Sequence, residues 1–187
     1  MQYARSHKIF NRKSTCLILI DFQEKLIPAI SGNEAVSENI VKLLKAFNIL
    51  KIPVFYTEQN PEKLGKTPAR IKDLITQPDP YVKTTFSIIG LPKLWEQVRE
   101  HGLNSVVLAG IESHVCVTQS ALDLYENGLR VSVPQDCTGS RHIHNYQTAM
   151  NRLRSAGIDI TCVESVIFEL IDDYTIPEFK DVLKILK

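Results

Sequence analysis

A cysteine follows a buried strand and a tight turn in the middle of this chain. Val106–Ala109 are four apolar residues typical of a strand, Gly110 begins a polar turn, and Cys116 falls in the first turn of a helix predicted over residues 113–127. The free N–H groups at the start of a helix stabilise an anion, including a thiolate. A small buried hydrophobe is the alternative interpretation, because free cysteine is among the most buried residue types.

An aspartate and a lysine lie at or near the ends of two other predicted strands. Asp21 follows the apolar run at residues 15–20, and Lys83 lies in the alternating run at residues 81–86. Because the carboxyl ends of parallel strands converge on one edge of a doubly wound sheet, both side chains are expected near Cys116. An ammonium group lowers the pKa of a nearby thiol, and a carboxylate can move the thiol proton to a leaving group. Asp21 alone would also fit an ordinary turn.

Other catalytic signatures are missing from the sequence. Neither G-x-S-x-G nor G-x-G-x-x-G occurs, and His114 is too close to Cys116 in sequence to share its helix face. His142 and His144 are interpreted as surface residues, because no carboxylate or third histidine lies close to them. The segment 60–67 resembles a phosphate-binding loop but begins with asparagine where that loop needs glycine.

Strands and helices alternate along the chain and would position these residues. The predicted strands are residues 15–20, 53–57, 81–86, 105–109, 129–133 and 158–163, and the predicted helices are residues 33–51, 69–75, 91–101, 113–127, 144–156 and 177–186. No repeat, low-complexity tract or linker interrupts the pattern. It predicts an α/β fold, with a parallel sheet covered by helices on both faces.

Composition narrows the class of protein. The 187 residues predict one domain, residues 1–187, with residues 1–14 as a flexible basic leader. A net charge of +1 without a basic field argues against a nucleic-acid partner, and no apolar run is long enough for a membrane span. The four cysteines lie far apart, which favours free thiols in a reducing compartment. We therefore expect a cytoplasmic protein, although the basic leader also resembles an organelle-targeting segment and leaves a mitochondrial location open.

Five segments of the chain, residues 17–28, 56–67, 82–87, 108–124 and 136–157, share the pattern of one family. Together they resemble the isochorismatase-like cysteine hydrolases, and the first two look like the branch of isochorismatase-domain-containing proteins. The resemblance implies a Rossmann-like three-layer α/β/α fold with a six-stranded parallel sheet. It also implies that Asp21, Lys83 and Cys116 form a catalytic triad.

Further expectations about the site come from the same resemblance. It implies a cis peptide between Ile111 and Glu112, which would aim the N–H groups of Glu112 and Cys116 into an oxyanion hole. It also implies a substrate pocket, although each wall residue would also fit ordinary packing or loop structure. The candidate wall residues are Phe22, Gln23, Gln59, Phe86 and Ile111.

One departure from the family concerns metal. The nicotinamidases of this superfamily bind a divalent metal through an Asp-x-His pair and a second histidine after the second strand, where this chain has Glu58, Gln59 and Asn60. We therefore expect no metal and no cofactor.

The sequence thus predicts a metal-independent hydrolase that acts on a small amide or related acyl C–N compound through a thioester on Cys116. A non-catalytic binding or scaffold protein that retained the fold is one alternative, and an isochorismatase- or nicotinamidase-type activity is another. An RNA-processing role lacks the expected charge pattern. The expected partners are a small-molecule substrate and further copies of the chain, as a dimer or tetramer.

Overall fold

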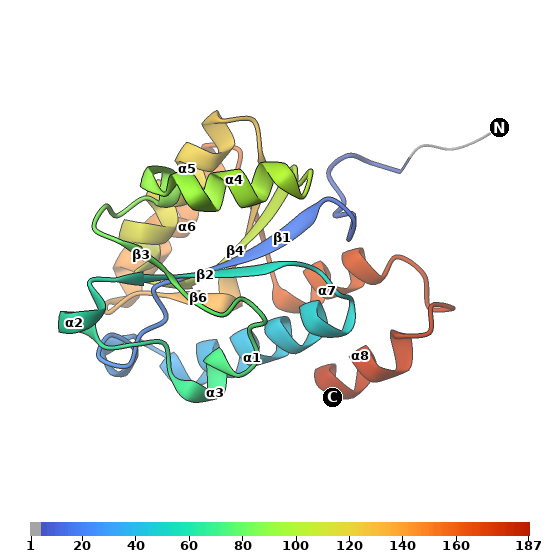
Figure 1. The fold of residues 1–187 in the computed structure, drawn as a ribbon, viewed down its shortest axis with the longest axis horizontal. Coiled ribbons are helices and arrows are strands. Elements are labelled where there is room, and N and C mark those ends of the chain that lie inside the picture. Colours follow the sequence, from blue (N-terminus) through green and yellow to red (C-terminus); the bar gives the residue numbers. More distant parts are fainter. Residues whose placement is uncertain (1–4) are drawn as a thin grey trace.

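A parallel sheet forms the centre of the computed structural model, which describes residues 5–187 (Figure 1). Its strand order is β3-β2-β1-β4-β5-β7, and β6 pairs with β4 beyond the end of β5. All pairings are parallel, and the α/β prediction is confirmed. The strands are β1 (Thr15–Ile20), β2 (Val54–Gln59), β3 (Tyr81–Lys83), β4 (Ser105–Ile111), β5 (Arg130–Pro134), β6 (Thr138–Gly139) and β7 (Asp159–Thr161). The two-residue β6 was not predicted.

Helices cover both faces of the sheet (Figure 1). On one face, α1 (Asn33–Ile49) and α7 (Val163–Ile171) share a core with the odd-numbered residues of β1, such as Leu17, and α8 (Phe179–Leu186) packs against α1. On the other face, α4 (Pro92–Glu100), α5 (Thr118–Glu126) and α6 (Ile143–Ser155) pack against its even-numbered residues, such as Ile18. Successive side chains of a strand point to opposite faces, so the continuous apolar run of β1 supplies both cores. The three-layer arrangement expected from the sequence is confirmed.

Short elements complete the chain. They are the helices α2 (Pro61–Leu64) and α3 (Ala69–Lys72), the 3-10 turns η1 (Ile27–Ala29), η2 (Ile88–Gly90) and η4 (Gln135–Cys137), and the π-helical turn η3 (Ser113–Val117). Within residues 5–187, none of the helices combines the length and the apolar character required to cross a membrane.

The helix predicted over residues 113–127 is two elements. The π-helical turn η3 comes first, and regular α-helix begins only at Thr118. The Thr118 hydroxyl donates to the carbonyl oxygen of Ser113, five residues earlier, at 2.6 Å. That side-chain bond stabilises the wider turn, as in the π-bulges found at many functional sites. Cys116 therefore lies on a π-helical turn, not in the first turn of an α-helix.

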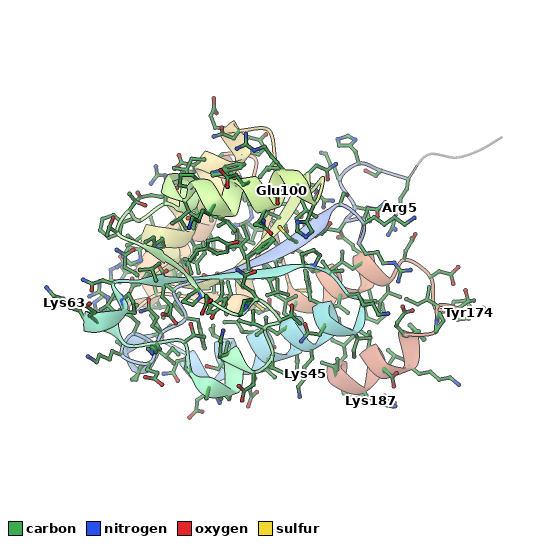
Figure 2. The ribbon with its side chains drawn as sticks, in the orientation of Figure 1. Arg5, Lys45, Lys63, Glu100, Tyr174 and Lys187 are labelled. Carbon is green, nitrogen blue, oxygen red and sulfur yellow. The ribbon has the colours of Figure 1, made fainter. Side chains whose placement is uncertain are left out.

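Residues of the predicted leader contact the folded part of the chain. Residues 1–4 lie outside the described part of the chain, but Phe10 is buried in the core, and its N–H donates to the Glu169 carboxylate at 3.0 Å. Arg5, labelled in Figure 2, pairs with Asp172 just after α7. The buried Phe10 ring and the Arg5 ion pair therefore connect the described part of the leader to the core and to the end of α7.

Gly110 lets β1 and β4 approach closely at the edge of the sheet that carries Asp21. It pairs with Ile20, has φ 133°, and leaves no room for a Cβ atom, which would overlap the Ile20 carbonyl oxygen. We expect Gly110→Ala to lower the free energy of unfolding by more than about 3 kcal/mol, through overlap and backbone strain together. Urea unfolding measures this.

Gly128→Ala is the matched control, because Gly128 has φ 82° with nothing near the position of an added Cβ. This substitution should lower the free energy of unfolding only by the strain of a left-handed alanine, about 1–2 kcal/mol. Equal losses of unfolding free energy in Gly110→Ala and Gly128→Ala would contradict the close approach of β1 and β4 at Gly110.

Candidate active site

Asp21 leaves β1 in a conformation that its neighbour β2 holds. Its backbone is left-handed, with φ 48°, and its N–H donates to the Thr57 carbonyl oxygen at 3.2 Å. The Thr57 hydroxyl donates to Asp21 Oδ1 at 2.8 Å. Left-handed backbone is costly for a residue with a side chain and is concentrated at functional sites. Asp21 is thus a buried carboxylate with one oxygen occupied by Thr57 and Oδ2 left for another partner.

Lys83 supplies that partner from the end of β3. Its Nζ lies 2.7 Å from Asp21 Oδ2, and the Lys83 side chain is fully buried. The same Nζ donates to Gln59 Oε1 at 2.7 Å and to the carbonyl oxygens of Thr85 and Phe86 at 3.1 and 3.2 Å. A buried ion pair is tolerated when further hydrogen bonds satisfy the charged groups. The chain bends after Lys83 and brings these carbonyls back to the ammonium.

Cys116 completes the cluster from the turn η3 after β4, which lies on the other side of β1 from β2 and β3. Its Sγ lies 3.6 Å from Lys83 Nζ, and the residue is 7% exposed. Three side chains from β1, β3 and the turn after β4 therefore meet at one edge of the sheet. The proximity predicted from strand ends is confirmed.

Burial and the Asp21 carboxylate raise the pKa of the Cys116 thiol to about 12. Burial has the largest effect, Asp21 adds to it, and the Lys83 ammonium lowers the pKa only in part. Lys83 lowers this pKa as expected, but burial and Asp21 outweigh it, and the expected helix start is missing at Cys116. The thiol is dehydrated beside a carboxylate, and α5 begins only after it. The resting group is a neutral thiol that needs a base.

Asp21→Asn should lower the pKa of the Cys116 thiol, because it removes a negative charge and leaves Lys83 in place. The pH profile of Cys116 alkylation by iodoacetamide, followed by peptide mass spectrometry, measures this. At pH 8 the variant should alkylate faster than the wild type. Asp123→Asn on α5 is the control and should leave the profile unchanged. A slower reaction or a higher pKa in Asp21→Asn would contradict this electrostatic account.

A cavity of about 230 Å³ opens beside Cys116 and Asp21. Three predicted wall residues line it, namely Gln59, Phe86 and Ile111. Sequence reasoning missed further lining residues, because none of them stands at the end of a predicted strand. These are Leu26, Leu64, Val115 and Arg141. Glu112, which was expected only as an oxyanion-hole donor, also lines the cavity.

Two predicted wall residues lie elsewhere. Phe22 is buried in the core beneath α1 and is not among the lining residues. Gln23 is fully buried, and its amide donates to the carbonyl oxygens of Gln59 and Gly65 while accepting from the Gln59 N–H at 2.8 Å. All these partners of the Gln23 amide lie at the end of β2 or in the loop after it. Gln23 therefore supports the cavity wall without forming it.

The turn before Cys116 differs from the expectation at its peptide bond. The Ile111–Glu112 peptide is trans, and the chain turns instead through left-handed backbone at Glu112, with φ 57° and ψ 58°. Side chains fasten this turn to the segment after β6. Ser113 and Thr138 share a hydrogen bond of 2.8 Å, and Glu112 Oε1 accepts from Arg141 Nε at 2.8 Å. Those bonds hold the left-handed turn in place.

At the end of β2, where the nicotinamidases have metal ligands, Glu58 and Gln59 form hydrogen bonds within the chain. Glu58 is buried and accepts the Thr67 N–H at 2.7 Å, while the Gln59 amide donates to the Thr84 carbonyl oxygen. Within residues 5–187, no three or more histidine, cysteine, aspartate or glutamate side chains are grouped closely enough to hold a metal ion. His142 and His144 stack on each other at the exposed start of α6, with ring centroids 5.5 Å apart.

Comparison with known proteins places the chain in a family. Residues 15–165 match the model of the isochorismatase domain. The chain is 39% identical over 168 residues to isochorismatase domain-containing protein 1 of Danio rerio, covering 89% of this chain and 59% of that protein. It is 37% identical over 175 residues to isochorismatase domain-containing protein 2 of Bos taurus, covering 93% of this chain and 83% of that protein.

A solved structure shares the whole architecture. The protein described as MAR1 ribonuclease from Caenorhabditis elegans superposes with a TM-score of 0.90 at 33% identity, covering 95% of this chain and 92% of that one. The fold, the family model and these relatives agree, and the chain belongs to the isochorismatase family.

Proposed function

We propose that this chain hydrolyses a small amide or related acyl C–N compound through a thioester on Cys116. One observation carries the proposal. Lys83 Nζ lies 3.6 Å from Cys116 Sγ and 2.7 Å from Asp21 Oδ2, and Cys116 and Asp21 line a cavity large enough for a small molecule. A nucleophile, a charge-stabilising cation and a base in contact are the requirements of covalent acyl transfer. Membership of the isochorismatase family supports hydrolysis as the reaction class.

In the proposed reaction, Asp21 takes up one proton and gives it back during formation of the thioester, and does so again during its hydrolysis. Asp21 takes the thiol proton, and Cys116 Sγ attacks the carbonyl carbon to form a tetrahedral intermediate. The C–N bond then breaks, Asp21 gives its proton to the leaving amine, and a thioester remains. Asp21 next takes a proton from water, whose oxygen attacks the thioester. The carboxylic acid leaves as Asp21 returns the proton to Sγ. Lys83 stabilises the negative charge on Sγ and on Asp21 throughout.

The N–H groups of Glu112 and Cys116 are proposed as donors to the oxyanion. Both belong to the turn that leads from β4 through η3, and the side-chain bonds of Glu112 and Ser113 fix that turn. Donors held in place before the reaction stabilise the charge that develops on the carbonyl oxygen.

Ammonia release from a panel of short, uncharged primary amides tests the proposal. The wild type should release ammonia with EDTA present, and Cys116→Ala should not. Release that stops with EDTA and resumes with a divalent metal would overturn the metal-independent mechanism. The scaffold alternative predicts no release from any amide and an unreactive Cys116.

RNA cleavage is a second candidate, favoured by the description of the Caenorhabditis elegans relative as a ribonuclease. RNA would have to bind at another surface of the protein, because the cavity beside Cys116 is small and mainly lined by apolar side chains. Incubation of labelled RNA with the wild type and with Cys116→Ala separates the two. Cleavage that survives in Cys116→Ala would favour a ribonuclease that does not use this site.

We also propose that the chain forms a homo-oligomer, a dimer or tetramer. Val82 and Phe86 flank the site and are 52% and 54% exposed, which is high for apolar side chains. Light scattering with size-exclusion chromatography measures the mass. A monomer at micromolar concentration would overturn this proposal without affecting the chemistry at Cys116.

A further inference from the structure

The cavity beside Cys116 contains a cation at its wall. Arg141 lines the cavity together with Glu112, and its side chain is 59% exposed. An arginine in a substrate cavity ordinarily selects a carboxylate or phosphate, because the guanidinium presents several donors to a planar anion.

Glu112 changes this balance. Its Oε1 accepts from Arg141 Nε at 2.8 Å, and its side chain is 11% exposed. The other oxygen, Oε2, lies 3.3 Å from His114 Nδ1 and has no hydrogen bond within residues 5–187. The His114 ring is itself held by Ser140 at 3.0 Å. The buried carboxylate therefore offsets the arginine charge where the substrate would bind.

The rest of the lining is uncharged apart from Asp21, whose carboxylate is paired with the buried Lys83 behind the wall. Five apolar side chains face the cavity, namely Leu26, Leu64, Phe86, Ile111 and Val115. An anionic acyl group would have to leave water for this surface without a free cation to pair with, which is costly.

We propose that Glu112 is a specificity-determining residue, which neutralises Arg141 and makes the cavity select an uncharged, apolar acyl group over an anionic one. The inference rests on the proposed function for its substrate class. It predicts a switch: without the Glu112 charge, Arg141 is released to bind an anion, and the preference moves toward carboxylate-bearing substrates.

Two alkylating reagents that differ in charge test the switch without any substrate. Iodoacetamide is neutral and iodoacetate is anionic, and both transfer a two-carbon group to Sγ with loss of iodide. The rates at Cys116 are measured at one pH in a Cys162→Ser background, because Cys162 is partly exposed. Their ratio cancels changes in the reactivity of the thiol itself. Glu112→Gln should raise the iodoacetate-to-iodoacetamide ratio at least about tenfold, from one uncompensated charge close to the reagent.

The double variant Glu112→Gln/Arg141→Gln is the matched control, because it removes both charges of the pair. Its ratio should return to within about threefold of the wild-type value. An unchanged ratio in Glu112→Gln, or a raised ratio that persists in the double variant, would overturn the proposal.

Amides extend the same comparison to turnover. Succinamate and 4-methylpentanamide have nearly the same shape, with a carboxylate in one where the other has an isopropyl group. The wild type should prefer 4-methylpentanamide, and kcat/KM for succinamate relative to it should rise at least about tenfold in Glu112→Gln. If neither amide is hydrolysed while the alkylation ratio shifts as expected, the proposed function fails and the charge inference stands. If amides are hydrolysed without a shift in either ratio, the inference fails alone.

Discussion

Cys116→Ala should lower kcat for amide hydrolysis by about a thousandfold or more while leaving the chain folded. The substitution removes the only sulfur in the cluster with Asp21 and Lys83, and no other side chain there can form the thioester. Loss of one small buried atom should cost about 1 kcal/mol of stability. Ammonia release gives kcat, and urea unfolding gives the free energy of unfolding.

Cys162→Ala is the control for thiol loss in general. Cys162 lies between β7 and α7, away from the cavity, so kcat should stay within about twofold of the wild type. A Cys116→Ala enzyme that keeps more than a tenth of the wild-type kcat would contradict the assignment of the nucleophile.

Lys83→Met should destabilise the protein by about 3–5 kcal/mol, because it leaves the Asp21 carboxylate buried and unpaired. The methionine is close to lysine in length and leaves little empty space. The double variant Asp21→Asn/Lys83→Met should recover most of this loss, since both charges are then gone, but it should recover no activity.

Urea unfolding of the wild type, the two single variants and the double variant forms a double-mutant cycle. Recovery of stability without recovery of hydrolysis separates the role of the ion pair in folding from its role in chemistry. Two results would contradict this role of the ion pair. One is a Lys83→Met protein as stable as the wild type, and the other is a double variant less stable than Lys83→Met.

The central sheet and the meeting of three side chains could be predicted from the sequence because both follow from simple geometry. The run Thr15–Ile20 is apolar from Cys16 onward, which indicates a strand covered on both faces, and all six residues are buried. Parallel strands then bring Asp21, Lys83 and the turn before Cys116 to one edge.

Features that depend on contacts between distant segments could not be predicted in the same way. The raised pKa of Cys116 arises from burial and from Asp21, and neither the depth of burial nor the distance between the two groups follows from spacing in the sequence. Arg141 lines the cavity from the segment after β6, and the pairing of that two-residue strand with β4 has no signal in the sequence. Phe22 and Gln23 sit next to Asp21 in sequence, yet the left-handed turn at Asp21 sends them into the core and the loop.

Acylation of Cys116 by an activated ester would test the central claim most directly. p-Nitrophenyl butyrate carries a good leaving group, so attack on it is fast and hydrolysis of the thioester should limit turnover. The enzyme is mixed with the ester, quenched in acid, and examined by intact-mass and peptide mass spectrometry. We predict one butyryl group per chain, located on Cys116, removed by hydroxylamine and missing from Cys116→Ala. Ester turnover with no acyl group on Cys116, or with the group on another residue, would contradict the account.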